Sequence, residues 1–379
     1  MQNQALVLID KFKGSLSQVE INEVLIKVLK ANGVKFRAFQ MADGGDGSLA
    51  ALASLGWQLK ELRVTGPLDD EHPAKYALSA DGKIAALELS ELCGIKLLNG
   101  KRAPYQAHTR AIGEAIRKIS GEGWSELWLL LGGSASNDGG LGVLQGLGVE
   151  VRDSRGNSVK SGLSGLAEAN QIESDAKLIV EKFLRGRKVK VITDVSSPLL
   201  GRRGAIATFG KQKGLGRAGR MRAEATMRRW RQLVTESTKR DESRTAGAGA
   251  AGGVGFLALS FLGAEYQAGA DTFLKLLGVK GEINAQSLVF TGEGRIDESS
   301  LSGKCVLPIL ELVKINGAKA ILVCGSYDEQ VIKRLQSEFP IVEIVALSDS
   351  GLPKVEQIAQ AKFVLEDELT KKFNPDWVA

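Results

Sequence analysis

The chain has 379 residues. A single hydrophobic core usually holds together fewer residues than this, so we expect two domains. Its 44% hydrophobic and 25% charged residues are typical of a globular protein, and 45 glycines beside 8 prolines exclude a Gly/Pro-rich disordered chain. A formal charge of +6 at pH 7 suits anionic small molecules and also permits nucleic-acid binding.

The cysteine and histidine pattern argues against a disulfide scaffold and against a structural zinc site. Cys93, Cys305 and Cys324 are far apart and odd in number, and only 2 histidines occur. We therefore expect a reducing, cytoplasmic location. The first residues, MQNQALVLIDKFKG, contain no basic segment before a predicted strand, so we expect no signal peptide.

Short apolar runs, each followed by a glycine cluster and a helical pattern, recur along the chain. In chain order the predicted strands lie in ALVLID, FRAFQMA, LWLLLGG, SLVFTGEG, AILVCGS and VEIVALS. Strands that alternate with helices predict a mostly parallel sheet with helices on both faces. The wholly apolar run at 127–131 fits a strand that is buried on both sides.

The middle of the chain departs from this rhythm. Two extended stretches between about residues 62 and 89 flank Asp81-Gly82, which is typical of an antiparallel hairpin. A strand in VKVI is then followed by an irregular loop. We therefore predict a mixed α/β domain formed by residues 62–274, and a discontinuous doubly wound domain formed by residues 1–61 and 275–379.

Two further stretches admit more than one interpretation. Residues 246–264 are uncharged and long enough for a membrane span, but their glycine-rich first half favours a loop that enters a buried helix. Between Arg202 and Arg244, thirteen Lys or Arg residues outnumber four Asp or Glu residues. This segment could bind nucleic acid, but it matches no DNA-binding motif, so a solvated basic helix is favoured. We expect neither a membrane nor a nucleic-acid partner.

The candidate functional residues lie in loops that follow predicted strands. Ligands of open α/β sheets bind beyond the carboxyl ends of the strands, where glycine lets backbone N–H groups approach phosphate oxygens. Phosphoryl transfer also needs a cationic side chain, carboxylates for Mg²⁺ and a group that accepts the proton of the attacked hydroxyl. Five loops carry these residue types together.

The first of these loops is DKFKGSLS, residues 10–17, between a strand and a helix. Asp10, Lys11, Lys13 and Ser15 could form a phosphate cradle there. The alternative is a helix cap made by Ser15 or Ser17, with both lysines in solvent. The loop alone does not separate these interpretations.

The second loop is MADGGDGS, residues 41–48. Asp43 and Asp46 flank the pair Gly44-Gly45, so carboxylates and free amides could meet at one strand end and bind a metal or a substrate hydroxyl. The alternative is a tight turn that caps the next helix. A calcium loop is excluded because the downstream glutamate that it requires is missing.

The third and fifth loops are LGGSASNDGGLG, residues 131–142, and TDVSSPLLGRRGA, residues 193–205. Ser134, Asn137 and Asp138 crowd among glycines after a very apolar strand, which favours a functional loop. Asp194 follows a predicted strand, although a turn at Ser197-Pro198 explains part of that pattern.

The fourth loop is TGEGRIDESSLSGK, residues 291–304. Its candidate residues carry both signs of charge: Glu293, Arg295, Asp297 and Lys304. It is not a Walker A loop, because Cys305 stands where serine or threonine is required.

Taken in order, these loops resemble the motifs of the bacterial glycerate kinase family. The family patterns are D-S-F-K-G-S, A-D-G-G-E-G-T, G-G-S-A-T-N-D-G-G, D-V-x-N-P-L-x-G with Q-K-G after it, G-A-G-A-A-G-G and G-E-G-R-x-D-x-Q-T-x-x-G-K. The corresponding segments here are DKFKGS, ADGGDGS, GGSASNDGG, DVSSPLLG with QKG, GAGAAGG and GEGRIDESSLSGK. The likeness runs from about residue 5 to about residue 325.

The resemblance implies a flavodoxin-like domain and a second mixed α/β domain, with the active site in the cleft between them. It implies an enzyme that phosphorylates D-glycerate with ATP and Mg²⁺, with 2-phosphoglycerate as the favoured product. The expected partners are then small molecules, glycerate and ATP, and we expect a monomer or a homodimer. Lys13 and Ser15 would bind a phosphate or the glycerate carboxylate, and either Asp194 or Asp43 would act as the base.

Departures from the family patterns leave the substrate open. Lys11 replaces a serine, Ser197 replaces an asparagine, and residues 299–300 are Ser-Ser in place of Gln-Thr. A kinase for another small hydroxy acid and a catalytically silent ligand-binding protein therefore stay as alternatives. The phosphorylated hydroxyl and the metal ligands are not assigned.

Overall fold

A computed structural model describes residues 4–301 and 305–377. The chain divides into two compact units, one made by residues up to Asp43 together with those from Ala270 onward, and one made by Gly44–Gly269. The first junction lies earlier than the one expected after residue 61, because helix α2 (Ser48–Ser54) packs against strands β4 and β5 of the second unit.

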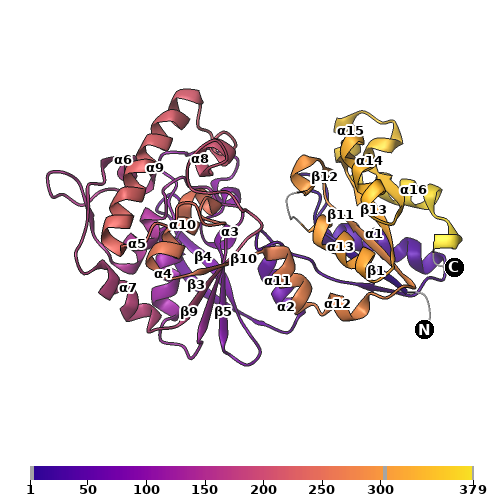
Figure 1. The fold of residues 1–379 in the computed structure, drawn as a ribbon, viewed down its shortest axis with the longest axis horizontal. Coiled ribbons are helices and arrows are strands. Elements are labelled where there is room, and N and C mark those ends of the chain that lie inside the picture. Colours follow the sequence, from indigo (N-terminus) through magenta and orange to yellow (C-terminus); the bar gives the residue numbers. More distant parts are fainter. Residues whose placement is uncertain (1–3, 302–304, 378–379) are drawn as a thin grey trace. The chain divides into compact units, whose positions relative to one another are not determined.

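The first unit contains the flavodoxin-like parallel sheet that was expected. Its strands are β1 (Gln4–Ile9), β2 (Phe36–Ala38), β11 (Ser287–Gly292), β13 (Lys319–Cys324) and β15 (Ile341–Ala346). Their spatial order is β2-β1-β11-β13-β15, with every neighbour parallel. Figure 1 labels β1, β11 and β13 of this sheet. This is the 2-1-3-4-5 order of flavodoxin-like folds, which reverses between β1 and β11. The carboxyl ends of β1 and β11 therefore flank the switch point at which such sheets bind ligands.

Helices and short strands complete the first unit. They are α1 (Gln18–Ala31), α11 (Gly269–Leu276), α12 (Val279–Glu282), α13 (Val306–Ile315), α14 (Glu329–Glu338), α15 (Lys354–Ala359), α16 (Ala361–Lys372), β12 (Arg295–Ile296) and β14 (Ser326–Tyr327). Helix α1 begins with a capping box, in which Ser17 Oγ accepts the Glu20 N–H at 3.3 Å and the Glu20 carboxylate accepts the Ser17 N–H at 2.8 Å. Ser17, rather than Ser15, is therefore the cap.

The second unit contains a mixed sheet in the order β10-β9-β6-β5-β4-β3. Its strands are β3 (Gln58–Thr65), β4 (Glu71–Leu78), β5 (Ile84–Glu88), β6 (Glu126–Leu130), β9 (Lys188–Ile192) and β10 (Glu265–Gln267). Strands β5, β6, β9 and β10 are parallel to one another, so their carboxyl ends meet at one edge. Strand β4 is antiparallel to both of its neighbours, β3 and β5. The hairpin predicted around Asp81-Gly82 is confirmed, because β4 and β5 pair across that turn.

The second unit also contains helices and two short strands outside this sheet. They are α3 (Leu89–Cys93), α4 (Arg110–Ile119), α5 (Leu141–Leu147), α6 (Gly162–Glu168), α7 (Ala176–Leu184), α8 (Ala205–Phe209), α9 (Arg217–Thr238), α10 (Val254–Phe261), β7 (Val151–Arg152) and β8 (Gln171–Ile172). Every residue of α10 is buried, and a glycine-rich turn precedes it, so the buried-helix interpretation of residues 246–264 is confirmed. Within the described ranges, no helix combines the length and the apolar character that a membrane crossing needs.

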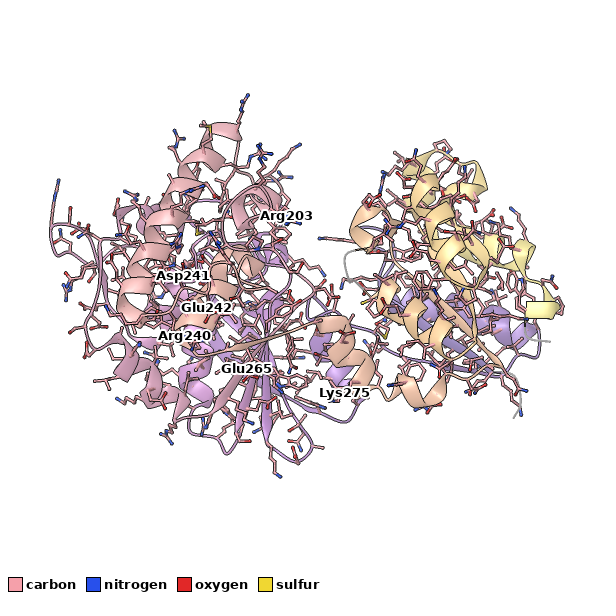
Figure 2. The ribbon with its side chains drawn as sticks, viewed as in Figure 1. Arg203, Arg240, Asp241, Glu242, Glu265 and Lys275 are labelled. Carbon is pink, nitrogen blue, oxygen red and sulfur yellow. The ribbon has the colours of Figure 1, made fainter. Side chains whose placement is uncertain are left out.

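The arginine-rich segment forms helix α9, as predicted. The helix buries Met227, Trp230 and Val234 along one face, and its arginines lie largely on the exposed remainder. Just beyond its end, Arg240 pairs with Glu242 at 2.8 Å (Figure 2). Within α9, Arg228 pairs with Glu224 at 3.5 Å. Surface pairs of this kind contribute about 0–1 kcal/mol, so the helix is held mainly by its apolar face.

Candidate functional site

Three carboxylates gather at the switch point of the first sheet. Asp10 follows β1 and Glu293 follows β11, and the Asp10 N–H donates to the Gly292 carbonyl at 3.1 Å. Asp43 lies in the loop after β2, close enough that its charge acts on Asp10. The residues that the first, second and fourth loops contribute thus meet where a flavodoxin-like sheet binds its ligand.

Asp10 is the most strongly perturbed of these groups. Its side chain is 20% exposed, and burial first, then the negative charges of Asp43 and Glu293, raise its pKa to about 6. The Lys11 ammonium, 3.8 Å from the Asp10 carboxylate, opposes that rise. The edge is therefore rich in negative charge and would gain from a bound cation.

The rest of the DKFKGS loop presents a cation beside this edge. Lys13 is exposed, Gly14 has a positive φ of 89°, and Ser15 Oγ donates to the Phe12 carbonyl at 3.3 Å. A Cβ atom on Gly294 would lie 3.1 Å from the backbone nitrogen of Lys13, so the fourth loop packs directly against the first. Ser15 closes a turn in this structure, whereas Lys13 reaches into solvent.

Arg295 and Asp297 lie further along the fourth loop. Their side chains form an ion pair at 3.3 Å, with Arg295 62% exposed and Asp297 37% exposed. Both are accessible to a ligand, and both follow β11 and Glu293 in the chain. Lys304 lies outside the described residues.

In the second unit, Gly44 and Gly45 are held by close backbone contacts. Gly44 has a φ of 79°, and a Cβ atom there would lie 2.4 Å from the Ile192 carbonyl oxygen at the end of β9. A Cβ atom on Gly132 would lie 2.2 Å from the Gly45 Cα. Only glycine fits these contacts, so the second and third loops pack together at the carboxyl edge of the sheet.

Glu88 organises the same region and was not identified from the sequence. It ends β5, is 1% exposed, and accepts the N–H groups of Gly47 at 3.1 Å and Leu49 at 2.8 Å, together with the Ser90 hydroxyl. Burial raises its pKa, and these hydrogen bonds partly offset the rise. Asp46, in the same loop, pairs with Lys96. A carboxylate at a strand end was the available signal for Glu88.

Asp138 in the third loop is occupied by backbone groups. It is fully buried and accepts the Thr109 N–H at 2.9 Å, the Thr109 hydroxyl at 2.8 Å, and the N–H groups of Gly140 at 3.3 Å and Gly142 at 3.2 Å. These bonds join the starts of α4 and α5. Asp138 therefore shapes the loop from within.

Ser134 and Asn137 meet a lysine that comes from another part of the chain. Lys213, in the QKG motif, donates to Ser134 Oγ at 3.1 Å and to the Ser136 carbonyl at 2.5 Å. The Asn137 amide nitrogen donates to the Pro104 carbonyl at 3.4 Å, while its buried Oδ1 has no hydrogen-bond partner in the part of the chain that the structure describes. Sequence reasoning did not single out Lys213.

Asp194 follows β9 at the edge where the third loop follows β6. The neighbouring Thr193 is buried and donates from Oγ1 to the Leu131 carbonyl at 3.2 Å, which ties the two strand ends together. Asp194 itself is partly buried. The second unit thus brings Asp194, Gly44, Gly45, Ser134 and Asn137 to one edge of its sheet.

Over residues 4–301 and 305–377, no three or more Asp, Glu, His or Cys side chains are arranged to hold a metal ion by themselves. Mg²⁺ in nucleotide sites is usually held by one or two carboxylates together with substrate phosphates. The hard oxygen ligands of Asp10 and Glu293 fit a cation of that kind.

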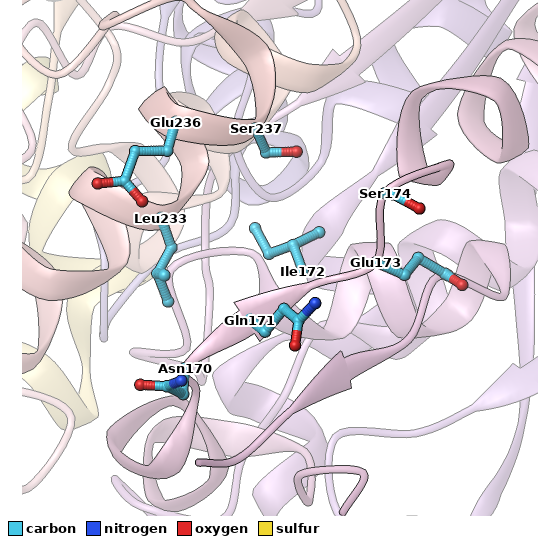
Figure 3. A pocket seen from close by; sticks show the side chains of 8 residues that line it. All are labelled: Asn170, Gln171, Ile172, Glu173, Ser174, Leu233, Glu236 and Ser237. Carbon is cyan, nitrogen blue, oxygen red and sulfur yellow. The ribbon is translucent and has the colours of Figure 1, made fainter. Parts of the chain in front are cut away.

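A cavity of about 330 Å³ lies in the second unit, between β8 and α9 (Figure 3). Ile172 and Leu233 line it together with polar side chains such as Glu173 and Glu236. None of the residues that were expected to act on a ligand lies in it, so it has no part in the candidate site.

Comparison with known proteins identifies what this arrangement is similar to. The model of the glycerate kinase family matches residues 5–373. The glycerate 2-kinase of Escherichia coli K12 is 32% identical over 326 residues, which covers 85% of each chain. The glycerate kinase of Haemophilus influenzae is 33% identical over 353 residues, which covers 90% of this chain and 92% of that protein.

A solved structure shares the fold. The crystal structure of a glycerate kinase 2 from Salmonella typhimurium LT2 matches with a TM-score of 0.77 and 28% identity, and the match covers 98% of this chain and 96% of that one. The mixed α/β architecture described above is therefore the architecture of that protein.

Proposed function

Because the chain belongs to the glycerate kinase family, we propose that it transfers the terminal phosphoryl group of ATP to D-glycerate, with Mg²⁺, and forms 2-phosphoglycerate. A glycerate hydroxyl oxygen forms the new bond to phosphorus, and the bond between the γ-phosphorus and the β,γ-bridging oxygen breaks. ADP leaves, and the hydroxyl proton passes to a carboxylate. The name glycerate 2-kinase of the relative from Escherichia coli supports the 2-hydroxyl as acceptor.

The observation that carries this proposal is the charge at the switch point of the first sheet. Asp10, Asp43 and Glu293 crowd there beside the exposed cation of Lys13. Phosphoryl transfer is catalysed mainly by positioning and by charge stabilisation, and it needs both a cation holder and a cationic side chain. Asp10 and Glu293 would hold Mg²⁺, which neutralises charge on the nucleotide phosphates when it is bound.

The remaining roles follow from position. Lys13 would bind a phosphate or the glycerate carboxylate, and the exposed Arg295 would meet the same anions. The amides of Gly44, Gly45 and the Ser134 loop suit anionic oxygens. Asp194 and Asp43 are the alternative bases, one at a strand end of the second unit and one in the loop after β2 of the first.

The direct test supplies purified protein with D-glycerate, ATP and Mg²⁺ and follows ADP release. Phosphorus and carbon NMR of the product identifies the carbon that bears the phosphate, and we expect carbon 2. Absence of turnover above background would reject the assignment to glycerate. Phosphate on carbon 3 would reject only the regiochemistry.

A second candidate is a kinase for another small hydroxy acid. The charge that Lys11 adds beside Asp10 is the observation that favours it, because the family pattern has a neutral serine there. A panel of hydroxy acids of similar size tests this candidate. If kcat/KM is at least tenfold higher for another acid than for D-glycerate, that acid is the substrate in place of glycerate.

We expect Lys13→Ala to lower kcat/KM at least tenfold, which corresponds to about 1.4 kcal/mol of transition-state stabilisation. The Lys13 side chain is exposed, so its loss removes a charge at the site with little effect on packing. Steady-state kinetics with both substrates measures the effect. Lys333→Ala, which removes an exposed lysine from α14, is the matched control, and unchanged kinetics in Lys13→Ala would remove that residue from the site.

We expect Asp194→Asn to lower kcat at least tenfold, because asparagine keeps the shape of the side chain but accepts no proton. Asp43→Asn is measured beside it, and the larger loss of kcat identifies the base. Asp175→Asn changes an exposed aspartate before α7 and serves as the control. If Asp194→Asn and Asp43→Asn both show the same kinetics as the control, neither carboxylate is the base.

A further inference from the structure

Lys213 is a buried cation that the reaction scheme above does not use. The residue is 4% exposed, and it reaches the third loop from the connection between α8 and α9. Its ammonium donates to Ser134 Oγ at 3.1 Å and to the Ser136 carbonyl at 2.5 Å. Two positions of the loop are therefore pinned by one side chain that lies far away in the sequence.

The glycine-rich motif before α10 makes room for this arrangement. Gly252 has a φ of 69°, and a Cβ atom there would lie 2.2 Å from the Ser136 carbonyl oxygen and 3.1 Å from Lys213 Nζ. The backbone of the GAGAAGG motif thus presses against the same contact from the other side. Three motifs, GGSASND, QKG and GAGAAGG, converge on the Lys213 ammonium.

Burying a lysine costs free energy, so its contacts must compensate. The ionisable groups around the ammonium are Asp138 and the Cys93 thiol. Burial raises the pKa of that thiol, which keeps it neutral. Asp138 is the nearby negative charge, and its oxygens accept hydrogen bonds from Thr109, Gly140 and Gly142. The direct partners of Lys213 are thus neutral groups of the loop.

We propose that Lys213 is a positioning residue whose ammonium holds residues 132–137 in the conformation that binds the anionic substrates. Gly132 and Gly133 precede these contacts, and Gly133 is exposed, so the loop backbone is accessible where Lys213 does not cover it. The role in binding rests on the proposed function, whereas the ordering of the loop does not. Hydrogen bonds from a charged donor are roughly twice as strong as neutral ones, so the loop is held best while Lys213 is protonated.

The charge on Lys213 can be changed within an accessible pH range. Burial lowers the pKa of Lys213 to about 8, with the charge of Asp138 opposing the shift. Above that pH the ammonium becomes a neutral amine, and the loop contacts weaken. We therefore expect the dissociation constants of ATP and D-glycerate for the wild-type protein to rise at least threefold between pH 7 and pH 9.5. This corresponds to a loss of about 0.6 kcal/mol in binding free energy.

The test compares Lys213→Met with Lys211→Met, which makes the same change at an exposed lysine of the same segment. Hydrogen–deuterium exchange of peptides that cover residues 131–140 reports the order of the loop. Titration with ATP and with D-glycerate gives the dissociation constants. In Lys213→Met we expect the amides of this loop to exchange at least tenfold faster. We also expect the variant to bind one or both substrates at least tenfold more weakly, with no further weakening between pH 7 and pH 9.5.

The outcomes separate this inference from the proposed kinase activity. Faster loop exchange in Lys213→Met, in a protein whose wild type shows no turnover of D-glycerate, would support the positioning role and reject the assignment to glycerate. Turnover in the wild type, with loop exchange and KM in Lys213→Met equal to those of Lys211→Met, would overturn the positioning role. If Lys213→Met does not fold, the wild type decides alone, because dissociation constants that are constant from pH 7 to pH 9.5 would also overturn it.

Discussion

Replacing Asp138 with alanine is expected to lower the free energy of unfolding of the second unit by about 3–5 kcal/mol. The carboxylate is fully buried and accepts hydrogen bonds from Thr109, Gly140 and Gly142. Its loss leaves these N–H groups buried without an acceptor, and each such group costs about 1–3 kcal/mol. The starts of α4 and α5 would lose their shared anchor.

Asp153→Ala is the matched control for that experiment. Asp153 also accepts backbone N–H groups, from Arg155 at 2.8 Å and Asn157 at 2.9 Å, but it lies in an exposed turn where water can replace it. We expect a cost of about 1 kcal/mol or less there. Denaturant unfolding followed by circular dichroism measures both. Equal losses in the two variants would contradict a structural role for Asp138.

In the third loop, the residue types do not reveal which way each side chain points. The crowding of Ser134, Asn137 and Asp138 among glycines favoured a functional loop, but the sequence offered no means to separate the roles of the three residues. The contacts separate them: Asp138 faces the helix starts, whereas Ser134 faces Lys213. Side-chain direction depends on the backbone of the turn, and local residue types do not determine it.

The strand ends were predictable for a physical reason. Buried parallel strands require uninterrupted apolar runs, and the polar and glycine residues that follow must lie at the sheet edge. Glu88 and Lys213 escaped because each acts on a loop distant in sequence, Glu88 on the start of α2 and Lys213 on residues 134–136. The position of Glu88 at a strand end was a local signal, but no local spacing records which distant groups Glu88 and Lys213 contact.

The junction between the units illustrates the same limit. ADGGDGS is one motif in sequence, yet Asp43 belongs to the first unit and Gly44 to the second. The carbonyl of Ile192 lies against Gly44, and the backbone of Gly132 lies against Gly45. These contacts between distant segments, rather than any change in composition, place the boundary inside the motif.

Asp10→Asn is expected to make the metal-free protein more stable at neutral pH and at the same time less active. Burial and the charges of Asp43 and Glu293 raise the pKa of Asp10 to about 6 from its ordinary value of 3.8. Between these two values the folded protein holds a proton that the unfolded chain releases, so stability falls as the pH rises. Above about pH 6 the full cost of the buried charge is present, and asparagine avoids it.

The gain in the free energy of unfolding is expected to be about 1–3 kcal/mol at pH 7–8 and to vanish near pH 4, since one pKa unit corresponds to about 1.4 kcal/mol. Denaturant unfolding from pH 4 to pH 8 with a chelator present measures it. Asp271→Asn removes an exposed carboxylate from the first turn of α11, where we expect a loss of about 0.3–1 kcal/mol instead.

We expect kcat/KM of Asp10→Asn to fall at least tenfold, because the charge that destabilises the fold is the charge that would hold Mg²⁺. A less stable Asp10→Asn at pH 7 would contradict the crowding of carboxylates, and a fully active one would remove Asp10 from the site.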